Sequence, residues 1–172
     1  TKDLCAILLP DAGYLQEEEA RYANKRGYSK HKPALPLYTE ENGRHCLELF
    51  QPHDYHKNFT IGDSLTIKFT PAGHILGSAC VHVSDGKKDV VFSGDVGRPD
   101  APVMKAPEPI EKVDYLVVES TYGNRRHDQA DPKEELKEVI NNTAKRNGVI
   151  LIPSFAVGRA QTILSLISEL KL

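Results

Sequence analysis

Three short segments carry side chains that could bind a metal ion, and each follows a predicted strand. The segment TPAGHILGSA places His74 on a loop bounded by glycines, FSGDVGR places Asp95 between two glycines, and VESTYG places Glu119 at the end of an apolar run. Imidazole and carboxylate groups are the ligands that zinc takes in hydrolytic sites, where an aspartate can hold two ions together. The residue types therefore predict a metal-dependent hydrolytic site.

Each segment also has a purely structural interpretation. A glycine-flanked histidine is an ordinary turn in many proteins, Gly-Asp-Val-Gly forms Asx turns, and a glutamate at the end of a strand is usually solvated or caps a helix. Taken singly, none of the three segments distinguishes a metal site from an ordinary turn or cap. Their occurrence together and in this order favours the functional interpretation.

The remaining histidines and the cysteines are expected to have structural roles. His82 alternates with Val81 and Val83, so we expect it on the opposite face of its strand. We expect surface or solvated-loop positions for His31, His45, His53 and His56. The three cysteines show no paired spacing, which favours small core residues in a reducing, cytoplasmic compartment over a disulfide framework.

Hydrophobic periodicity and turn residues predict a layered α/β fold with a mixed β-sheet and flanking helices. We expect helices over 13–26 (ending at Gly27), 39–50, 131–146 and 161–172, and strands over 64–69, 80–83, 89–92, 113–118 and 149–152. The nearly continuous apolar run at 113–118 predicts a strand covered on both faces. Residues 98–110 hold four prolines and are expected to be a surface connection.

Composition excludes several classes of protein. The 172 residues suffice for a domain with its own core, and no apolar run is long enough to span a membrane. The net charge of −2 means that any nucleic acid must be bound through a local patch or a metal. The sequence starts without a methionine and stops within a predicted helix, so we expect a piece of a longer protein.

The segments PAGHILGSA, FSGDVGR, VESTYGNRRH and IPSFAVGRAQTIL resemble, in this order, the consecutive signatures of β-CASP nucleases of the metallo-β-lactamase fold. The resemblance extends upstream to residues 9–39 and so covers nearly the whole chain. It implies that 1–153 are the C-terminal portion of a metallo-β-lactamase-like domain, part of an αββα sandwich, and that 154–172 begin the β-CASP insertion.

The resemblance also implies roles for individual residues. His74 and Asp95 match zinc ligands, with Asp95 bridging two zinc ions. Glu119 matches an acidic catalytic residue that supports a histidine further along the family's chain. His127, Arg125, Arg126 and Arg159 are candidates for the substrate side. The family's main zinc motif, HxHxDH, has no match here, so we expect this chain alone to be inactive and without a two-zinc centre.

The leading hypothesis is a zinc-dependent hydrolase of phosphodiester bonds in single-stranded RNA, without membrane attachment. An alternative is a non-catalytic RNA-binding or scaffold paralogue, although retention of His74, Asp95 and Glu119 disfavours it. A small-molecule metallo-hydrolase is disfavoured by the STYG and SFAVGRAQ segments. We further expect the His74 and Asp95 loops to be adjacent, Glu119 to lie at the same sheet edge, and exposed strand edges to promote self-association.

Overall fold

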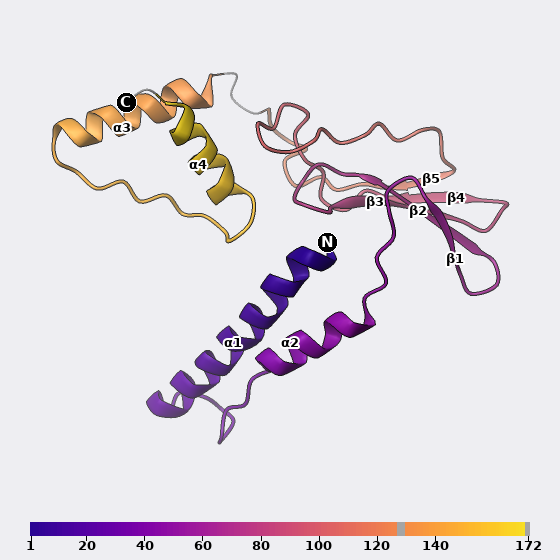
Figure 1. Cartoon of the computed structure of the whole chain (residues 1–172), viewed down its shortest axis with the longest axis horizontal. Coiled ribbons are helices and arrows are strands. Elements are labelled where there is room, and N and C mark those ends of the chain that lie inside the picture. The colour runs from indigo at the N-terminus through magenta and orange to yellow at the C-terminus, as the bar shows by residue number, and fades with distance from the viewer. Residues whose placement is uncertain (127–129, 171–172) are drawn as a thin grey trace. The chain divides into compact units, whose positions relative to one another are not determined.

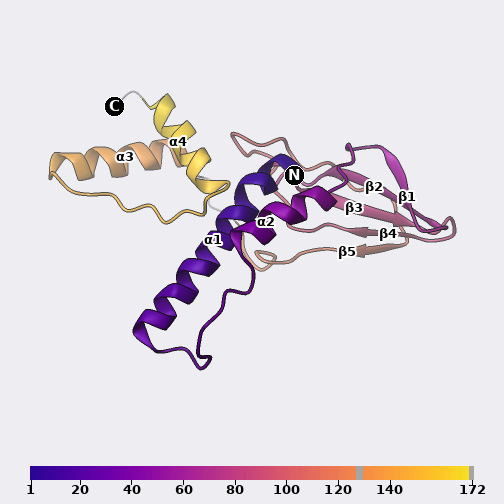
Figure 2. The same cartoon turned by 60° about the horizontal axis from the view of Figure 1, so that its bottom comes forward.

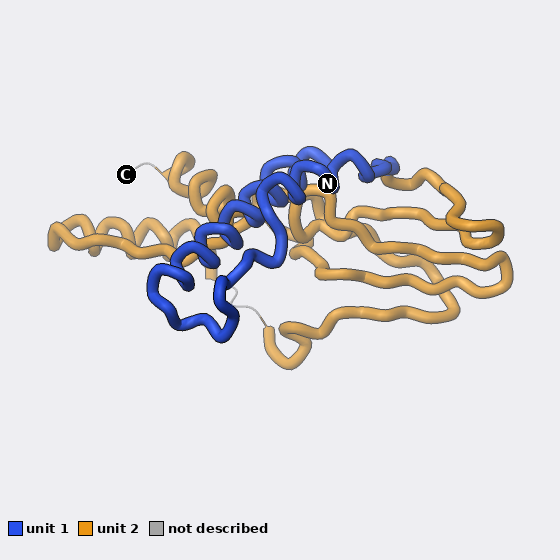
Figure 3. The backbone as a smooth tube through the Cα atoms, turned by 90° about the horizontal axis from the view of Figure 1, so that it is seen from below, with its two compact units in different colours: residues 1–54 blue, residues 55–172 orange. Residues whose placement is uncertain are grey.

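The computed structural model of the chain describes residues 1–126 and 130–170. The chain divides into two compact units, Thr1–Asp54 and Tyr55–Leu172 (Figure 3). No helix in the described part is long and apolar enough to cross a membrane. All three residues at the predicted metal site belong to the second unit.

The first unit is helical. It contains α1 (Lys2–Arg26) and α2 (Glu40–Cys46) (Figure 1), followed by the short 3₁₀ helix η1 (Leu47–Leu49). The predicted cap residues are confirmed: Gly27 ends α1 with a φ of 70°, and Thr39 begins α2 by accepting a hydrogen bond from Asn42 N–H. The predicted start of the first helix at residue 13 is wrong, because α1 already begins at Lys2 and continues through Pro10.

The second unit contains a five-stranded sheet in the order β1-β2-β3-β4-β5 (Figure 2). Its strands are β1 (Asn58–Ile61), β2 (Leu65–Pro71), β3 (Ala79–Ser84), β4 (Asp89–Phe92) and β5 (Tyr115–Val117). Neighbours are antiparallel except for the parallel pair β4–β5. The predicted α/β class and the mixed sheet are confirmed, whereas β1 was not predicted.

The strand register divides the side chains of the sheet between two faces. His82 shares its face with Lys68 on β2, Val91 on β4 and Cys80 on its own strand, whereas Val81 and Val83 lie on the other face, as predicted. A small core of Ala72, Cys80 and Val91 is fully buried, and Ile110 and Val113 pack against it. Cys80 is thus a core residue, as expected.

Because β4 and β5 are parallel, residues 93–114 must cross from the end of one strand to the start of the next. This crossover holds Asp95 near its beginning and Ile110 and Val113, which cover the core, near its end. At its end the Asp114 carboxylate accepts hydrogen bonds from Lys88 Nζ at 2.8 Å and Asp89 N–H at 2.9 Å. The surface connection predicted at 98–110 is part of this crossover.

The prediction that residues 113–118 form a strand covered on both faces is wrong. β5 is three residues long, and Tyr115, Leu116 and Val117 are 58%, 48% and 53% exposed. The strand lies at the end of the sheet order next to β4, and its exposed side chains show that little of the described chain packs on either of its faces. An apolar run can reveal a strand, but the run cannot show that another layer covers it.

The last described segment contains α3 (Pro132–Lys145) and α4 (Arg159–Glu169), joined by an ion pair of 2.8 Å between Lys133 and Glu169. Asp131 caps α3 by accepting a hydrogen bond from Lys133 N–H, as predicted. The strand predicted at 149–152 is wrong: these residues are in no strand, and Val149 and Leu151 are 84% and 86% exposed.

Candidate metal centre

His74 lies on a tight loop that directly follows β2. Gly73 takes a φ of 71°, which suits glycine and turns the chain at this point. The Ser78 hydroxyl then closes the loop by accepting hydrogen bonds from the backbone N–H groups of His74 and Ile75, at 3.0 and 3.2 Å. The imidazole is thereby held on an ordered loop while its side chain remains 47% exposed.

The loop that carries Asp95 follows β4 and packs directly on the His74 loop. Gly97 N–H donates a hydrogen bond of 2.8 Å to the Ala72 carbonyl. A Cβ atom at Gly97 would lie 2.7 Å from His74 N and would overlap the Gly73 carbonyl. The two loops therefore touch backbone to backbone, at a separation that only glycine permits at position 97.

This packing brings the two predicted zinc ligands together. His74 Nε2 lies 3.8 Å from Asp95 Oδ2, which confirms that the two loops are adjacent. Since zinc bonds to nitrogen and oxygen are about 2.1 Å long and zinc sites are tetrahedral, two ligands of one ion lie about 3.4 Å apart. The observed distance is about 0.4 Å longer, a gap that a small side-chain rotation closes, so the pair fits a shared metal ion.

Glu119 follows β5 and contacts the Asp95 loop from its other side. Its Oε1 accepts a hydrogen bond of 2.6 Å from Val96 N–H. This bond is the main reason that the pKa of Glu119 lies below its ordinary value, and the Thr121 hydroxyl and the nearby His74 lower the pKa further. Glu119 is therefore an ionised hydrogen-bond acceptor at neutral pH, at the sheet edge where it was expected.

His74 and Asp95 make up at most half of the ligand set of a closed zinc site. Within residues 1–126 and 130–170, no group of three or more His, Cys, Asp or Glu side chains could hold a metal ion. A catalytic zinc takes about three protein ligands and a water. The pair can thus contribute to a metal centre, and further ligands would have to come from elsewhere.

The candidate arginines of the substrate side make local contacts. Arg125 stacks over the Tyr122 ring at 4.8 Å, and Arg126 is exposed. The Arg159 guanidinium donates a hydrogen bond to the Pro153 carbonyl at the start of α4. His127 lies outside the described residues. The substrate roles of all four residues stay predictions.

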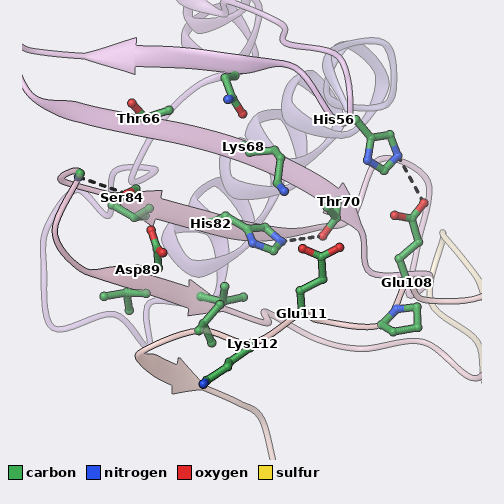
Figure 4. Close-up of a pocket in the computed structure, with 17 residues that line it drawn as sticks. His56, Thr66, Lys68, Thr70, His82, Ser84, Asp89, Glu108, Glu111 and Lys112 are labelled. Carbon is green, nitrogen blue, oxygen red and sulfur yellow. Dashed lines mark hydrogen bonds and ion pairs between the residues drawn. The ribbon is translucent and has the colours of Figure 1, made fainter.

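A separate cavity of about 440 Å³ lies over the face of the sheet that carries His82 (Figure 4). Two of its histidines already have partners: His56 Nε2 lies 3.3 Å from Glu108 Oε1, and His82 Nε2 lies 2.9 Å from Thr70 Oγ1. His56 is an exposed loop residue, as expected, and its contact with Glu108 links the start of the unit to the crossover. Burial lowers the pKa of His82, and Lys68 lowers it further.

The residues that hold the ligands in place were not predicted from the sequence. Ser78 closes the His74 loop, Ser93 is buried beneath the Asp95 loop, and Gly97 permits the two loops to touch. The serines are short polar residues beside glycines, a pattern shared by ordinary turns. Only the weak signal of a serine between the apolar end of β4 and Gly94-Asp95 could have indicated Ser93.

An α/β fold with a mixed sheet and a histidine–aspartate pair at strand ends is consistent with the metallo-β-lactamase class. Comparisons with known proteins identify the group within this class to which the chain belongs. The chain is 36% identical over 137 residues to an RNase J-like protein of Methanocaldococcus jannaschii, a match that covers 77% of the chain. It is 36% identical over 176 residues to the transcription termination factor FttA of Pyrococcus horikoshii, covering 98% of the chain.

A third relative is Integrator complex subunit 11 of Danio rerio, 32% identical over 165 residues that cover 95% of the chain. The chain spans 32%, 25% and 26% of the lengths of these three relatives, a third or less of each. No family model matches the chain. The chain belongs to the β-CASP group of metallo-β-lactamase-fold nucleases, the group to which these relatives belong.

Proposed function

We propose that this chain forms part of the active site of a zinc-dependent nuclease that hydrolyses phosphodiester bonds in single-stranded RNA. The observation that carries the proposal is the 3.8 Å separation of His74 Nε2 and Asp95 Oδ2 on two loops that touch. Family membership supports it, since relatives named as endoribonucleases match most of the chain.

Each residue of the site has a distinct part in this proposal. His74 Nε2 and Asp95 Oδ2 would hold zinc, and the wider centre would hold two ions. A bound zinc polarises a phosphoryl oxygen and lowers the pKa of a water molecule. Glu119 stays ionised beside the pair, where it fixes the Asp95 loop and can accept a hydrogen bond from an imidazole of the complete centre.

The substrate and setting are parts of the same proposal. Arg125, Arg126, Arg159 and His127 are the candidate contacts to RNA phosphates, because arginine binds phosphate with a planar pair of donors. The domain boundary between residues 153 and 154, with the β-CASP insertion beginning at 154, belongs to the proposal as well. Three free cysteines support a reducing, cytoplasmic compartment. The sheet edges at β1 and β5 support a tendency to self-associate.

The test uses the full-length protein that contains this chain. Zinc content is measured by elemental analysis, and cleavage is followed on a labelled single-stranded RNA. We expect His74→Ala and Asp95→Ala each to lose zinc and cleavage together. The matched control is His56→Ala, because His56 is also an exposed histidine paired with a carboxylate in the same unit but lies outside the proposed site.

Three results would count against the proposal. Zinc and cleavage that survive in His74→Ala and Asp95→Ala would remove these residues from the metal centre. Zinc binding without any cleavage of RNA by the unsubstituted protein would favour the scaffold alternative. An equal loss in His56→Ala would show that the effects come from general damage to the sheet.

A further inference from the structure

The backbone on both sides of Asp95 is fixed by hydrogen bonds to two side chains, those of Ser93 and Glu119. Ser93 Oγ donates a hydrogen bond of 2.7 Å to the Gly94 carbonyl, directly before Asp95. Glu119 Oε1 accepts the hydrogen bond of 2.6 Å from Val96 N–H, directly after Asp95. The peptide groups that flank the aspartate are thus each fixed by a separate side chain.

The same two residues are also bonded to each other. Glu119 N–H donates to Ser93 Oγ at 3.2 Å, so the serine hydroxyl acts as a donor to the Asp95 loop and as an acceptor from the end of β5. Ser93 N–H continues the strand pairing by donating to the Val117 carbonyl at 2.9 Å. Ser93, Gly94, Val96 and Glu119 therefore form a closed hydrogen-bonded ring around Asp95.

The burial of Ser93 shows that this ring is part of the folded interior. Ser93 is 1% exposed, one of the few buried polar residues of the described chain. A buried hydroxyl without partners would cost free energy, so its position beneath the loop depends on the bonds that it makes. The Asp95 side chain, in contrast, is 74% exposed and can only be aimed through its backbone.

We propose that Ser93 and Glu119 act together as positioning residues for Asp95, forming a clasp that holds the backbone of Asp95 close enough to His74 for the two side chains to bind a shared metal ion. This inference rests on the proposed function. It assigns Ser93 a role in metal binding and gives Glu119 a second role, independent of any contact with a catalytic histidine.

The geometry explains why such a clasp matters. The His74–Asp95 distance of 3.8 Å is about 0.4 Å above the separation of two ligands on one tetrahedral zinc ion, so the loop that carries Asp95 must stay in place for the pair to close on a metal. Loosening either flank of Asp95 removes a hydrogen bond that holds the loop there. Partners that orient a ligand in this way typically contribute about 10- to 100-fold to metal affinity.

Two measurements on the full-length protein test the clasp. Zinc affinity is determined by titration against a chromophoric chelator, and amide hydrogen exchange is followed in the peptide that contains residues 93–97. Ser93→Ala is expected to weaken zinc binding about 10- to 100-fold and to speed exchange at Val96. The control Thr70→Val removes another hydroxyl of low exposure from the same sheet, and should leave both readouts unchanged.

The variants Glu119→Ala and Glu119→Gln test the Glu119 side of the clasp. They remain informative if Ser93→Ala does not fold. Glutamine keeps a carbonyl oxygen that can accept from Val96 N–H, so it should retain zinc affinity, whereas alanine should lose about as much as Ser93→Ala. Wild-type affinity and exchange in both Ser93→Ala and Glu119→Ala would overturn the clasp. If the unsubstituted protein binds no zinc, the proposed function is wrong, and the exchange rates at Val96 alone decide the clasp.

Discussion

The contact between Gly97 and Gly73 sets the spacing of the two metal ligands, so we expect Gly97→Ala to abolish their shared ion. The added Cβ would lie 2.7 Å from His74 N, whereas carbon and nitrogen need about 3.5 Å. The Gly73 carbonyl is closer still, so the loops must separate by at least about 0.8 Å. Carried to the side chains, such a movement puts His74 Nε2 and Asp95 Oδ2 well beyond the separation of about 3.4 Å that one tetrahedral zinc ion allows two ligands.

The cost in stability can be estimated from the same contacts. Overpacking costs about 1–3 kcal/mol, and weakening the bond from Gly97 N–H to the Ala72 carbonyl adds about 1 kcal/mol. Gly86→Ala is the matched control, because Gly86 has a φ of 81° and open space around it. Alanine there costs about 1–2 kcal/mol through backbone strain alone.

Urea unfolding and zinc titration of both variants in the full-length protein separate the two effects. Gly97→Ala should lose stability and zinc affinity, whereas Gly86→Ala should lose stability alone. Zinc affinity of Gly97→Ala equal to that of the unsubstituted protein would refute the reasoning. It would mean that the loops rearrange without moving the ligands, or that the two residues do not share an ion.

Three further predictions concern other groups. Glu119→Gln should keep zinc and lose about 10² to 10⁴ of the rate of RNA cleavage, measured under single-turnover conditions; equal losses of zinc and rate would instead make Glu119 a ligand or a structural residue. Because burial lowers the pKa of His82 in the folded state, the unfolded state binds more protons, so stability should fall as the pH drops below about 6.5. Denaturant unfolding at several pH values should show this fall, and His82→Gln should reduce it; an unchanged pH profile would contradict the assignment. Burial also raises the pKa of the Cys80 thiol, so mass spectrometry after alkylation should find Cys5 and Cys46 modified first, and early modification of Cys80 would show that the core opens.

Local signals in the sequence predicted the elements that depend on local physics. Thr39 and Asp131 begin their helices with side-chain caps, and Gly27 ends the first helix in the left-handed conformation. Alternation on β2 and β3 gave the correct face for His82. Each of these features is decided by residues within a few positions along the chain, so a single sequence reveals them.

Features that depend on distant partners were not predictable in this way. The strand predicted at 149–152 has the right residue types, yet it pairs with no strand in the described part of the chain. β1 is short and is defined by its pairing with β2. For the site, residue types identified His74, Asp95 and Glu119, whereas the roles of Ser93 and Gly97 depend on contacts made across loops from different strands.

The crossover between β4 and β5 couples the site to the order in which the sheet assembles. The antiparallel strands β1 to β4 can form as successive hairpins, but β5 joins only after residues 93–114 have been laid across the sheet. The same step seals Val91 under Ile110 and Val113 and brings Glu119 to the Asp95 loop. In the full-length protein, metal affinity should therefore appear only after β5 has joined the sheet, and stopped-flow zinc capture should follow that step.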